Sequence, residues 1–367
     1  MYLQKLQLLN FKNYEEIALD FASKVNVLVG RNGSGKTNLL DAIYYLSFTK
    51  SAFATSDLHC VRKGESFLMV KAAFKKNNTV FEVSSAIQSG QKKVFREGGN
   101  EYQKLSDHIG RFPVIMIAPD DVDIIKEGSE ARRRFFDSAI SQLDKEYLNH
   151  LIVYNNALKQ RNSLLKMFAD SGRPDWLAIE SYDRLLVQHG EAIYTRRKRF
   201  CDEYLPVFRK YFNFLVNEAE TSTLAYESGV LTNGFQEQLV RNRQRDLVMQ
   251  RTNFGVHRDD YIFSLGEGDL KRLGSQGQQK SFVIALKLAQ FEILEQHNQF
   301  KPILLLDDIF DKLDDQRITK LLELIRSDLG QLFITDARPG RTKDLLDAVG
   351  VEATVLFVDA GRISVGH

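Results

Sequence analysis

The chain has 367 residues, of which 43% are hydrophobic and 27% are charged, and its formal net charge is +2. This composition is typical of a globular protein with two or three domains, and it excludes a disordered or collagen-like chain. No apolar run approaches the roughly 18 residues of a membrane span, so we expect a soluble, cytoplasmic protein without a membrane partner. The isolated Cys60 and Cys201 indicate neither a disulfide framework nor a zinc site.

Short strands around one helix are predicted for the first third of the chain. Apolar and polar residues alternate in four stretches, and two further runs are mostly apolar. The expected strands are Met1–Phe11, Ile17–Phe21, Val25–Val29, Leu68–Phe74, Val80–Ile87 and Phe112–Ala118. Leu39, Leu40, Ile43 and Leu46 follow at helical spacing and predict a helix after the third of these strands.

The loop between that strand and that helix fits the phosphate-binding pattern G-x-x-x-x-G-K-T. Backbone N–H groups of such a loop face phosphates, Lys36 reaches the β and γ phosphates, and the Thr37 hydroxyl coordinates Mg²⁺. A glycine-rich turn without a ligand is the alternative, but the order strand, loop, helix favours ATP. The candidate ATP-binding residues are Gly30, Arg31, Asn32, Gly33, Ser34, Gly35, Lys36, Thr37 and Asn38.

The middle of the chain has the period of helices from about Glu130 to Arg251, with few glycines. Residues 171–174, Ser-Gly-Arg-Pro, are expected to separate two long helices. Pro206 is expected to kink or divide the second helix. We interpret this part as a compact helical arm that is too short and irregular for a long coiled coil.

The last third returns to alternating strands and helices. Strands are expected near Ile262–Leu265 and at Ile303–Leu306, Leu332–Thr335 and Ala353–Val358, and helices at Gln278–Gln296 and Gln316–Ser327. Asp307 and Asp308 end one apolar run; alone, they also fit a buried strand with a polar end. Next to the P-loop strand, however, Asp307 would hold Mg²⁺ and Asp308 would orient the attacking water.

Residues 273–280, Leu-Gly-Ser-Gln-Gly-Gln-Gln-Lys, stand before the Gln278 helix and could be a cap and a turn. They resemble the signature motif of ATP-binding cassette (ABC) ATPases. The resemblance implies that Ser275, Gly277 and Gln278 bind the γ-phosphate held by a second subunit. Leu313 and Asp314 resemble the D-loop of the same class, whereas no histidine follows residues 333–336, where many cassette ATPases carry a switch histidine.

Further blocks are similar to those of the RecF family. They are Asn10–Tyr14, Pro119–Asp121 with Gly128 and Arg132–Asp137, Gly255–Asp260 and Ser275–Lys280. This resemblance implies an α/β fold, a P-loop ABC-type ATPase head of the Rad50/SMC kind. Its expected parts are an N-terminal ATPase lobe with a β-rich flank (1–125), an inserted helical arm (126–250) and a C-terminal ATPase lobe (251–367).

The resemblance also implies a function: ATP and Mg²⁺ would close a homodimer on duplex DNA, and weak, DNA-stimulated hydrolysis would release it. Lys36 and Asp308 would be the catalytic residues, and hydrolysis should be slow because aspartate is one methylene shorter than the usual glutamate. The implied role is recombinational repair of single-strand gaps and stalled forks, in the SOS response, with RecR and RecO as partners in loading RecA. An ABC-type ATPase subunit coupled to transport or to a nuclease is the alternative; it would need a membrane partner or an additional catalytic domain.

Basic clusters are candidates for DNA contact, although most charge runs are solvated helix faces. The candidates are Lys75, Lys76, Lys92, Lys93, Arg132 and Arg133, and further basic residues in such clusters are Arg96, Arg134, Arg196, Arg197, Lys198, Arg199, Arg241, Arg243 and Arg245. No aromatic-rich stacking platform accompanies them, which favours duplex over single-strand binding. For His257 we expect a local structural role as readily as a functional one.

Overall fold

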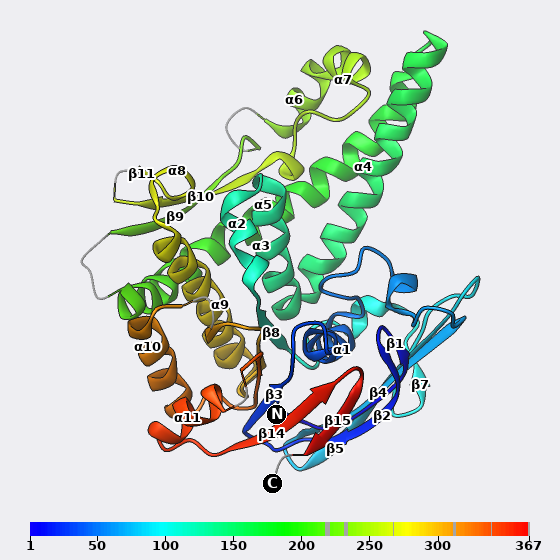
Figure 1. The fold of residues 1–367 in the computed structure, drawn as a ribbon. Coiled ribbons are helices and arrows are strands. Elements are labelled where there is room, and N and C mark those ends of the chain that lie inside the picture. Colours follow the sequence, from blue (N-terminus) through cyan, green and yellow to red (C-terminus); the bar gives the residue numbers. More distant parts are fainter. Residues whose placement is uncertain (217–220, 231–233, 267, 311–312, 339, 366–367) are drawn as a thin grey trace. The chain divides into compact units, whose positions relative to one another are not determined.

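The computed structural model describes residues 1–216, 221–230, 234–266, 268–310, 313–338 and 340–365, and these fall into two compact units. Unit 1 contains the described residues of Met1–Val122, Tyr211–Glu218 and Lys280–His367, and unit 2 contains those of Asp123–Lys210 and Ala219–Gln279. Figure 1 shows the helices and strands with the labels used below.

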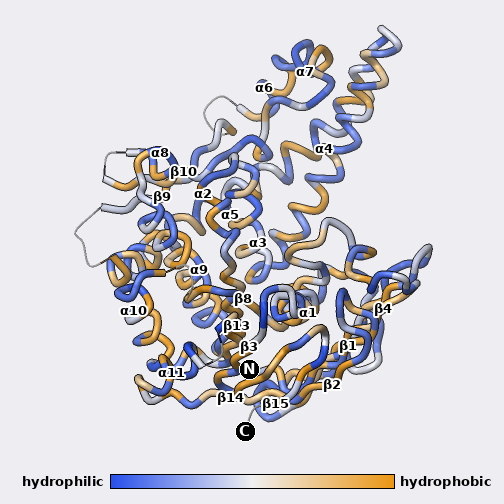
Figure 2. Tube along the Cα trace, in the orientation of Figure 1, coloured by the Kyte–Doolittle hydropathy of each residue, from blue (hydrophilic) through white to orange (hydrophobic). Residues whose placement is uncertain are grey.

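A mainly parallel sheet forms the centre of unit 1, in the strand order β15-β14-β3-β13-β12-β8. Its strands are β3 (Val25–Val29), β8 (Val114–Ile117), β12 (Ile303–Leu306), β13 (Leu332–Asp336), β14 (Ala353–Asp359) and β15 (Arg362–Val365). Only β15 is antiparallel to its neighbour. Every residue of β3, β8, β12 and β13 is buried, as a sheet covered on both faces requires, and the trace beside the labels β8 and β13 in Figure 2 is mostly orange, that is, hydrophobic.

An antiparallel sheet of unit 1 follows the order β2-β1-β4-β5-β6-β7. Its strands are β1 (Tyr2–Phe11), β2 (Tyr14–Asp20), β4 (Phe67–Lys76), β5 (Thr79–Gln88), β6 (Val94–Glu97) and β7 (Asn100–Glu101). Leu68, Val70, Ala72 and Phe74 alternate with more exposed residues along β4, so one face of this sheet joins the hydrophobic core.

The helices of unit 1 bury apolar faces against these strands. They are α1 (Lys36–Phe48), α10 (Asp315–Arg326), α11 (Arg341–Ala348) and the short turns η1 (Asp57–Cys60), η2 (Leu105–Asp107) and η3 (Pro119–Val122). In α10 the buried residues are Ile318, Leu321, Leu322 and Ile325, at the three- and four-residue spacing of one helix face. The same core cluster contains Leu39 and Ile43 of α1 with Leu28, Leu305 and Phe333 of the parallel sheet.

Unit 2 is mostly helical. Its helices are α2 (Asp123–Lys126), α3 (Ser129–Leu143), α4 (Lys145–Ser171), α6 (Phe235–Arg241), α7 (Arg243–Met249), α8 (Leu270–Leu273) and the turn η4 (Val256–Arg258). Two further helices cross the division between the units: α5 (Trp176–Val216) ends in unit 1 and α9 (Gln276–Asn298) begins in unit 2. A small antiparallel sheet has the order β11-β10-β9, formed by Gly268–Asp269, Asp260–Leu265 and Ser222–Glu227.

The predicted strands and helices of both α/β segments are present within a few residues of their expected bounds. Of the two outcomes expected at Pro206, a kink or a division of the helix, the division does not occur, since α5 runs through Pro206 without interruption. The units also divide the chain differently from the expected boundary at residue 251. Residues 260–265 pair with residues 222–227, and this long-range pairing, absent from local periodicity, places 251–279 in unit 2. None of the helices in the described ranges has the length and apolar character of a membrane span.

His108 is buried in the core of unit 1 among Phe95, Tyr102 and Phe112. Its Nε2 lies 2.6 Å from the carbonyl oxygen of Leu46. Burial lowers the pKa of His108 to about 4, because the charged imidazolium is poorly solvated there. A histidine whose pKa is lower in the folded state contributes stability above its unfolded pKa and loses it as the pH falls.

We therefore predict that the free energy of unfolding falls between pH 7 and pH 5, with about 2 kcal/mol of the loss due to His108. Replacing the ring in His108→Phe should remove that part of the pH dependence. Urea unfolding at the two pH values measures it. The exposed His59 provides the control, since His59→Gln should keep the full slope. An unchanged slope in His108→Phe would contradict the assignment.

Candidate functional site

The loop between β3 and α1 is a tight turn that only glycine can form at its critical points. Gly35 has a φ of +118°, and a Cβ there would lie 2.4 Å from the Asn13 Nδ2 atom. A Cβ on Gly30 would lie 2.1 Å from the carbonyl oxygen of Val358. The predicted P-loop residues 30–38 therefore form one continuous strand–turn–helix unit, with Lys36 as the first residue of α1.

The turn between β1 and β2 holds the P-loop from one side. Asn13 Nδ2 donates to the carbonyl oxygen of Ser34 at 3.0 Å, and Tyr14 OH donates to that of Gly35 at 2.9 Å. Asn38 Nδ2 donates to Asn13 Oδ1 at 2.7 Å. The amide of Gly361, in the turn between β14 and β15, also donates to Ser34, at 3.2 Å. Both ends of the chain thus fix the P-loop backbone.

Lys36 and Thr37 occupy the positions that the P-loop pattern predicts. Lys36 is buried, and its Nζ donates to the carbonyl oxygens of Gly30 and Arg31 at 2.7 and 3.2 Å. Its ammonium group therefore lies across the concave side of the loop. The Thr37 hydroxyl lies 3.0 Å from each carboxylate oxygen of Asp307, 270 positions away in the sequence.

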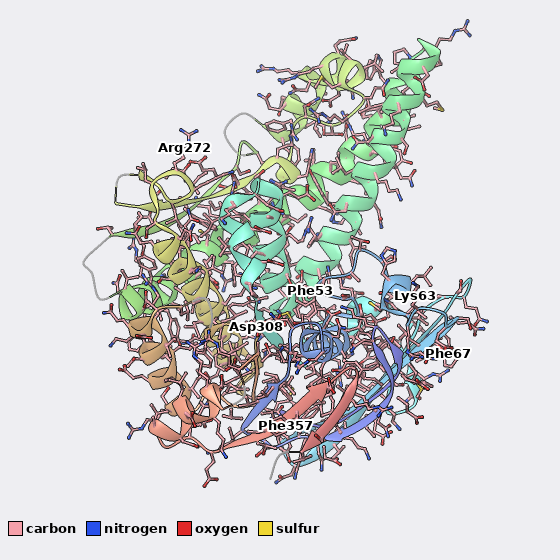
Figure 3. All side chains as sticks on the ribbon, in the orientation of Figure 1. Phe53, Lys63, Phe67, Arg272, Asp308 and Phe357 are labelled. Atoms are coloured by element: carbon pink, nitrogen blue, oxygen red, sulfur yellow. The ribbon has the colours of Figure 1, made fainter. Side chains whose placement is uncertain are left out.

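Asp307 and Asp308 follow directly after β12, at the carboxyl end of the parallel sheet. The expectation that β12 lies next to the P-loop strand is wrong, because β13 is hydrogen-bonded between β12 and β3. Thr335 of β13 spans that position: its hydroxyl donates to Asp307 Oδ1 at 2.7 Å and accepts from the Asp308 amide at 2.8 Å. Figure 3 labels Asp308, which has a left-handed backbone with a φ of +44°.

The surroundings of Asp307 suit a divalent cation. Burial raises the pKa of its carboxyl, and the negative charge of Asp308 adds to this, while Thr335, Thr37 and Lys36 counteract it. Two carboxyl groups and a hydroxyl are hard oxygen ligands of the kind that Mg²⁺ prefers. Thr37 and Asp307 are therefore the residues that would hold the metal, as the sequence predicts, and a cation there would offset the cost of burying the charge.

The P-loop itself suits a phosphate. Ser34 is buried, and its Oγ has no hydrogen-bond partner within the described residues. The Lys36 ammonium, this hydroxyl and the start of α1 all belong to the turn that a phosphate would occupy. The donor set of the loop therefore fits the triphosphate of ATP.

The predicted signature residues lie in unit 2, at the start of α9. The amide of Gln278 donates to Ser275 Oγ at 3.2 Å, and the amide of Ser275 donates to Gln278 Oε1 at 2.8 Å. This reciprocal pair is a capping box, which makes Ser275 the N-cap of α9. Ser275 is exposed, and Gly277 lies in the first turn of the helix. The local structure thus presents a helix N-terminus to solvent.

The predicted D-loop residue Asp314 is the N-cap of α10. Its Oδ1 accepts from the Arg317 amide at 3.0 Å, and its Oδ2 pairs with the Arg317 guanidinium. Arg317 Nε also donates to Ser281 Oγ of α9, at 2.5 Å. Asp314 therefore connects the segment after β12 to α9, within unit 1.

Two of the predicted DNA-contact residues have structural partners inside unit 2. Arg132 forms a bidentate ion pair with Asp260, at 2.7 and 2.8 Å. Arg133 donates to the carbonyl oxygen of Asp259. These bonds tie α3 to the start of β10, and in Arg132 they occupy the guanidinium group that a phosphate would need.

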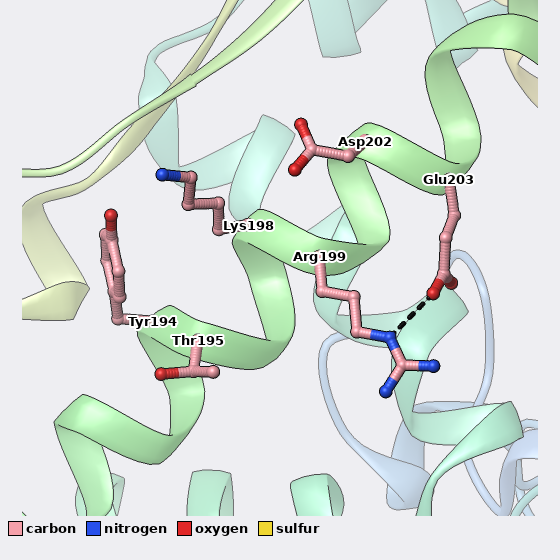
Figure 4. Close-up of a pocket in the computed structure, with 6 residues that line it drawn as sticks. All are labelled: Tyr194, Thr195, Lys198, Arg199, Asp202 and Glu203. Carbon is pink, nitrogen blue, oxygen red and sulfur yellow. Dashed lines mark hydrogen bonds and ion pairs between the residues drawn. The ribbon is translucent and has the colours of Figure 1, made fainter.

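The cluster Arg196–Arg199 is likewise divided between the interior and the surface. Arg197 is 2% exposed and donates to Asp137, Asp259 and the carbonyl oxygen of Val256. Arg199 pairs with Glu203 on the exposed side of α5, where both line a shallow hollow with Lys198 and Asp202 (Figure 4). Mixed charge in this hollow gives no preference for an anion.

The lysine candidates in unit 1 also differ in whether their ammonium groups have a partner within the protein. Lys93 pairs with Asp57 at 2.6 Å, and the Lys76 ammonium lies 3.8 Å from the centre of the Phe300 ring. Lys75 and Lys92 form no ion pair with any described residue, and Lys92 is exposed. Arg241 and Arg245 of unit 2 are also exposed. These four cations remain the better candidates for phosphate contact.

The Gly255–Asp260 motif is built around His257. Its Nδ1 lies 2.8 Å from Tyr154 OH, and its Nε2 lies 3.0 Å from the carbonyl oxygen of Thr252. Burial lowers the pKa of His257 to about 4, so the ring is neutral near pH 7. These contacts support a local structural role for His257, which links the Gly255–Asp260 motif to Tyr154 and Thr252.

Sequence reasoning missed Asn13, Tyr14 and Thr335. Asn13 and Tyr14 belong to the block Asn10–Tyr14, which only the family resemblance singles out, whereas Thr335 carries a signal of its own. It is one of two polar residues in a fully buried strand whose other residues are apolar, and a buried hydroxyl requires a hydrogen-bond partner.

Comparisons with known proteins agree with this geometry. Residues 2–355 match the family described as RecF/RecN/SMC N terminal domain. The chain is 44% identical to the DNA replication and repair protein RecF of Cytophaga hutchinsonii, over 99% of this chain and 96% of that protein. It is 44% identical to the RecF protein of Flavobacterium johnsoniae, over 94% and 97%.

Solved structures extend the likeness to the fold. A structure of the recombination mediator protein RecF with ATP, in the RecFOR pathway, has a TM-score of 0.90 at 28% identity, covering 100% of this chain and 98% of that one. The Smc head domain of Pyrococcus furiosus has a TM-score of 0.56 at 17% identity, covering 100% and 96%, and it shares the fold alone. The predicted SMC head-like α/β fold is confirmed.

The crowding at Gly35 predicts a large effect on nucleotide binding. Gly35→Ala should weaken ATP binding at least about tenfold, because the new methyl group displaces Asn13 and distorts the turn. Titration with a fluorescent ATP analogue measures it. Gly33→Ala is the matched control: Gly33 also has a positive φ, of +79°, but nothing lies within 4 Å of its Cβ position. Equal losses in both variants would show that strain alone is responsible.

Asp307→Asn should have opposite effects on the stability of the ligand-free protein and on its stabilisation by Mg²⁺ and ATP. The raised pKa of Asp307 means that ligand-free stability falls as the pH rises from its usual value of 3.8 through the raised one. At pH 7 the amide should therefore raise the melting temperature of the ligand-free protein. It should also abolish the further increase that Mg²⁺ and ATP give the wild type. A lower melting temperature without ligand would refute this.

Proposed function

Because this chain belongs to the RecF family, we propose that it is an ATP-dependent recombination mediator, which binds duplex DNA as an ATP-closed dimer and leaves it after hydrolysis. The single observation that carries the ATPase assignment is the position of Thr37. Its hydroxyl lies 3.0 Å from both oxygens of Asp307, next to the buried Lys36. The metal-binding and phosphate-binding halves of the site meet there.

Each residue of this half-site has a chemical task. Lys36 would neutralise the phosphate oxygens, and Thr37 with Asp307 would hold Mg²⁺. The metal would supply charge neutralisation on the β and γ phosphates. Asp308 would orient the attacking water and accept its proton. Its short side chain supports slow turnover, of the kind that suits a switch.

The second half of the site is proposed to come from another copy of the chain. Ser275 is exposed at the N-terminus of α9, and a helix N-terminus stabilises a phosphate through its free amides and its dipole. The γ-phosphate in one subunit would then hold Ser275, Gly277 and Gln278 of the other. ATP would act as part of the dimer interface.

Duplex DNA is proposed as the polymer that the dimer binds, through phosphate contacts of Lys75 and of the exposed cations Lys92, Arg241 and Arg245. The similar RecF structures are described as part of the RecFOR pathway, and this supports RecR and RecO as partners. With these partners the protein would help to load RecA at single-strand gaps and stalled forks. The hydrolysis rate is expected to be low and to increase on DNA.

Three variants test this mechanism, with dimer formation on a duplex measured by analytical ultracentrifugation. Lys36→Met should lose ATP binding, since the phosphates lose their cation. Ser275→Arg should keep the ATP affinity of one subunit but stay monomeric. Asp308→Asn should bind ATP and accumulate as a DNA-bound dimer, with turnover reduced at least about a hundredfold.

The same measurements contain their own controls. Arg199→Ala removes an exposed cation that already pairs with Glu203, so its dimerisation and DNA affinity should stay near those of the wild type. Normal ATP-dependent dimerisation of Ser275→Arg would refute the shared site. If the wild type binds the duplex with equal affinity with and without ATP, the proposed ATP switch is refuted.

A further inference from the structure

Thr335 is a buried polar residue at the end of β13, where the other buried side chains of the strand are mostly apolar. Its exposed fraction is 1%. It pairs in register with Leu28 of the P-loop strand, and β12 lies on the opposite side of β13. A hydroxyl in such a place costs free energy unless it is hydrogen-bonded, so its partners indicate why it is there.

The hydroxyl makes two bonds that use different parts of the group. It donates its proton to Asp307 Oδ1 at 2.7 Å, and its oxygen accepts the proton of the Asp308 amide at 2.8 Å. A threonine hydroxyl has one proton and two acceptor positions, so both bonds form at the same time. One side chain therefore fixes two consecutive residues of the candidate ATP site.

The second bond acts where the backbone of the site is strained. Asp308 has a φ of +44°, a left-handed conformation that is unfavourable for a residue other than glycine. Ladder pairing of β12 with β13 ends at Leu306, so the Asp308 amide lies beyond the sheet. Its bond to Thr335 holds the turn that sets the direction of the Asp308 side chain.

We propose that Thr335 is a positioning residue for ATP hydrolysis: its hydroxyl orients the Asp307 carboxylate toward the metal and holds the Asp308 backbone, so that the Asp308 carboxylate faces the attacking water. This inference rests on the proposed ATPase function and adds a residue to it. Thr335 touches neither nucleotide nor water in this scheme. It acts through the two aspartates.

The next residue along β13 does not share this task. Asp336 accepts from the Thr342 hydroxyl and from the Arg338 amide, at 2.8 Å for the amide, so both of its carboxylate oxygens stabilise the turn before α11. Its carbonyl oxygen accepts from the Gly30 amide at 3.2 Å. No described residue other than Thr335 bonds to both Asp307 and the Asp308 amide.

Three substitutions test the proposal. Thr335→Val keeps the shape and removes the hydroxyl, and Thr335→Ser keeps the hydroxyl and removes a methyl group. Thr342→Val is the matched control, because Thr342 is also 1% exposed and also donates to an aspartate, in its case Asp336. Steady-state hydrolysis gives kcat and KM, and melting temperatures are measured for all three variants.

The expected result is a specific loss of turnover. Thr335→Val should lower kcat at least about tenfold while the KM for ATP changes by less than about threefold, since Lys36 and the P-loop backbone are untouched. Thr335→Ser should recover most of the rate.

Other outcomes overturn the proposal. Wild-type kcat in Thr335→Val would do so, as would a kcat in Thr342→Val that falls as far as in Thr335→Val, because both indicate packing or stability alone. If Thr335→Val does not fold, Thr335→Ser decides through its kcat: a rate near that of the wild type supports the proposal, and a loss of about tenfold or more with the hydroxyl still present overturns it. Absence of hydrolysis in the wild type would instead refute the proposed function, so the two failures are distinguishable.

Discussion

Strand β13 is the element on which the candidate ATP site depends. It pairs with β3 on one side and with β12 on the other, so the turns after all three strands meet at one edge of the sheet. That edge brings Thr37 within 3.0 Å of Asp307, although 270 positions separate them. Most of the residues between them form unit 2. Thr37 and Asp307 are nevertheless close together, because the strands that precede them belong to the same parallel sheet.

Two buried arginines, Arg161 and Arg197, link several elements of unit 2 in addition to its apolar packing. Arg197 bonds to α3, to the segment before β10 and to Tyr147 of α4, and Arg161 pairs with Asp183 and Asp246 at 2.7 and 2.8 Å. Charges buried in this way are costly unless all partners are in place. The arrangement therefore favours one packing of the helices. Removing one of these aspartates should lower the free energy of unfolding strongly, because a buried arginine would be left without its partner.

The sequence predicted what depends on neighbouring residues. The apolar run Val25–Val29, the P-loop glycines and the period of α1 are local signals, and the structure confirms each. Partners far apart in the sequence were not predictable. The pair Arg132–Asp260 and the pairing of β9 with β10 cross more than thirty residues, and nothing near Arg132 distinguishes a structural guanidinium from a surface one.

Gly361 gives the C-terminal hairpin an importance that its position does not suggest. Its amide supports Ser34 in the P-loop, and β14 is the direct neighbour of β3. Deleting the last ten residues would thus remove the edge strand β15 from the parallel sheet. It would also remove the Gly361 amide that donates to Ser34 in the P-loop. In a deletion series, a truncation made far from every motif would behave like a lesion in the ATP site.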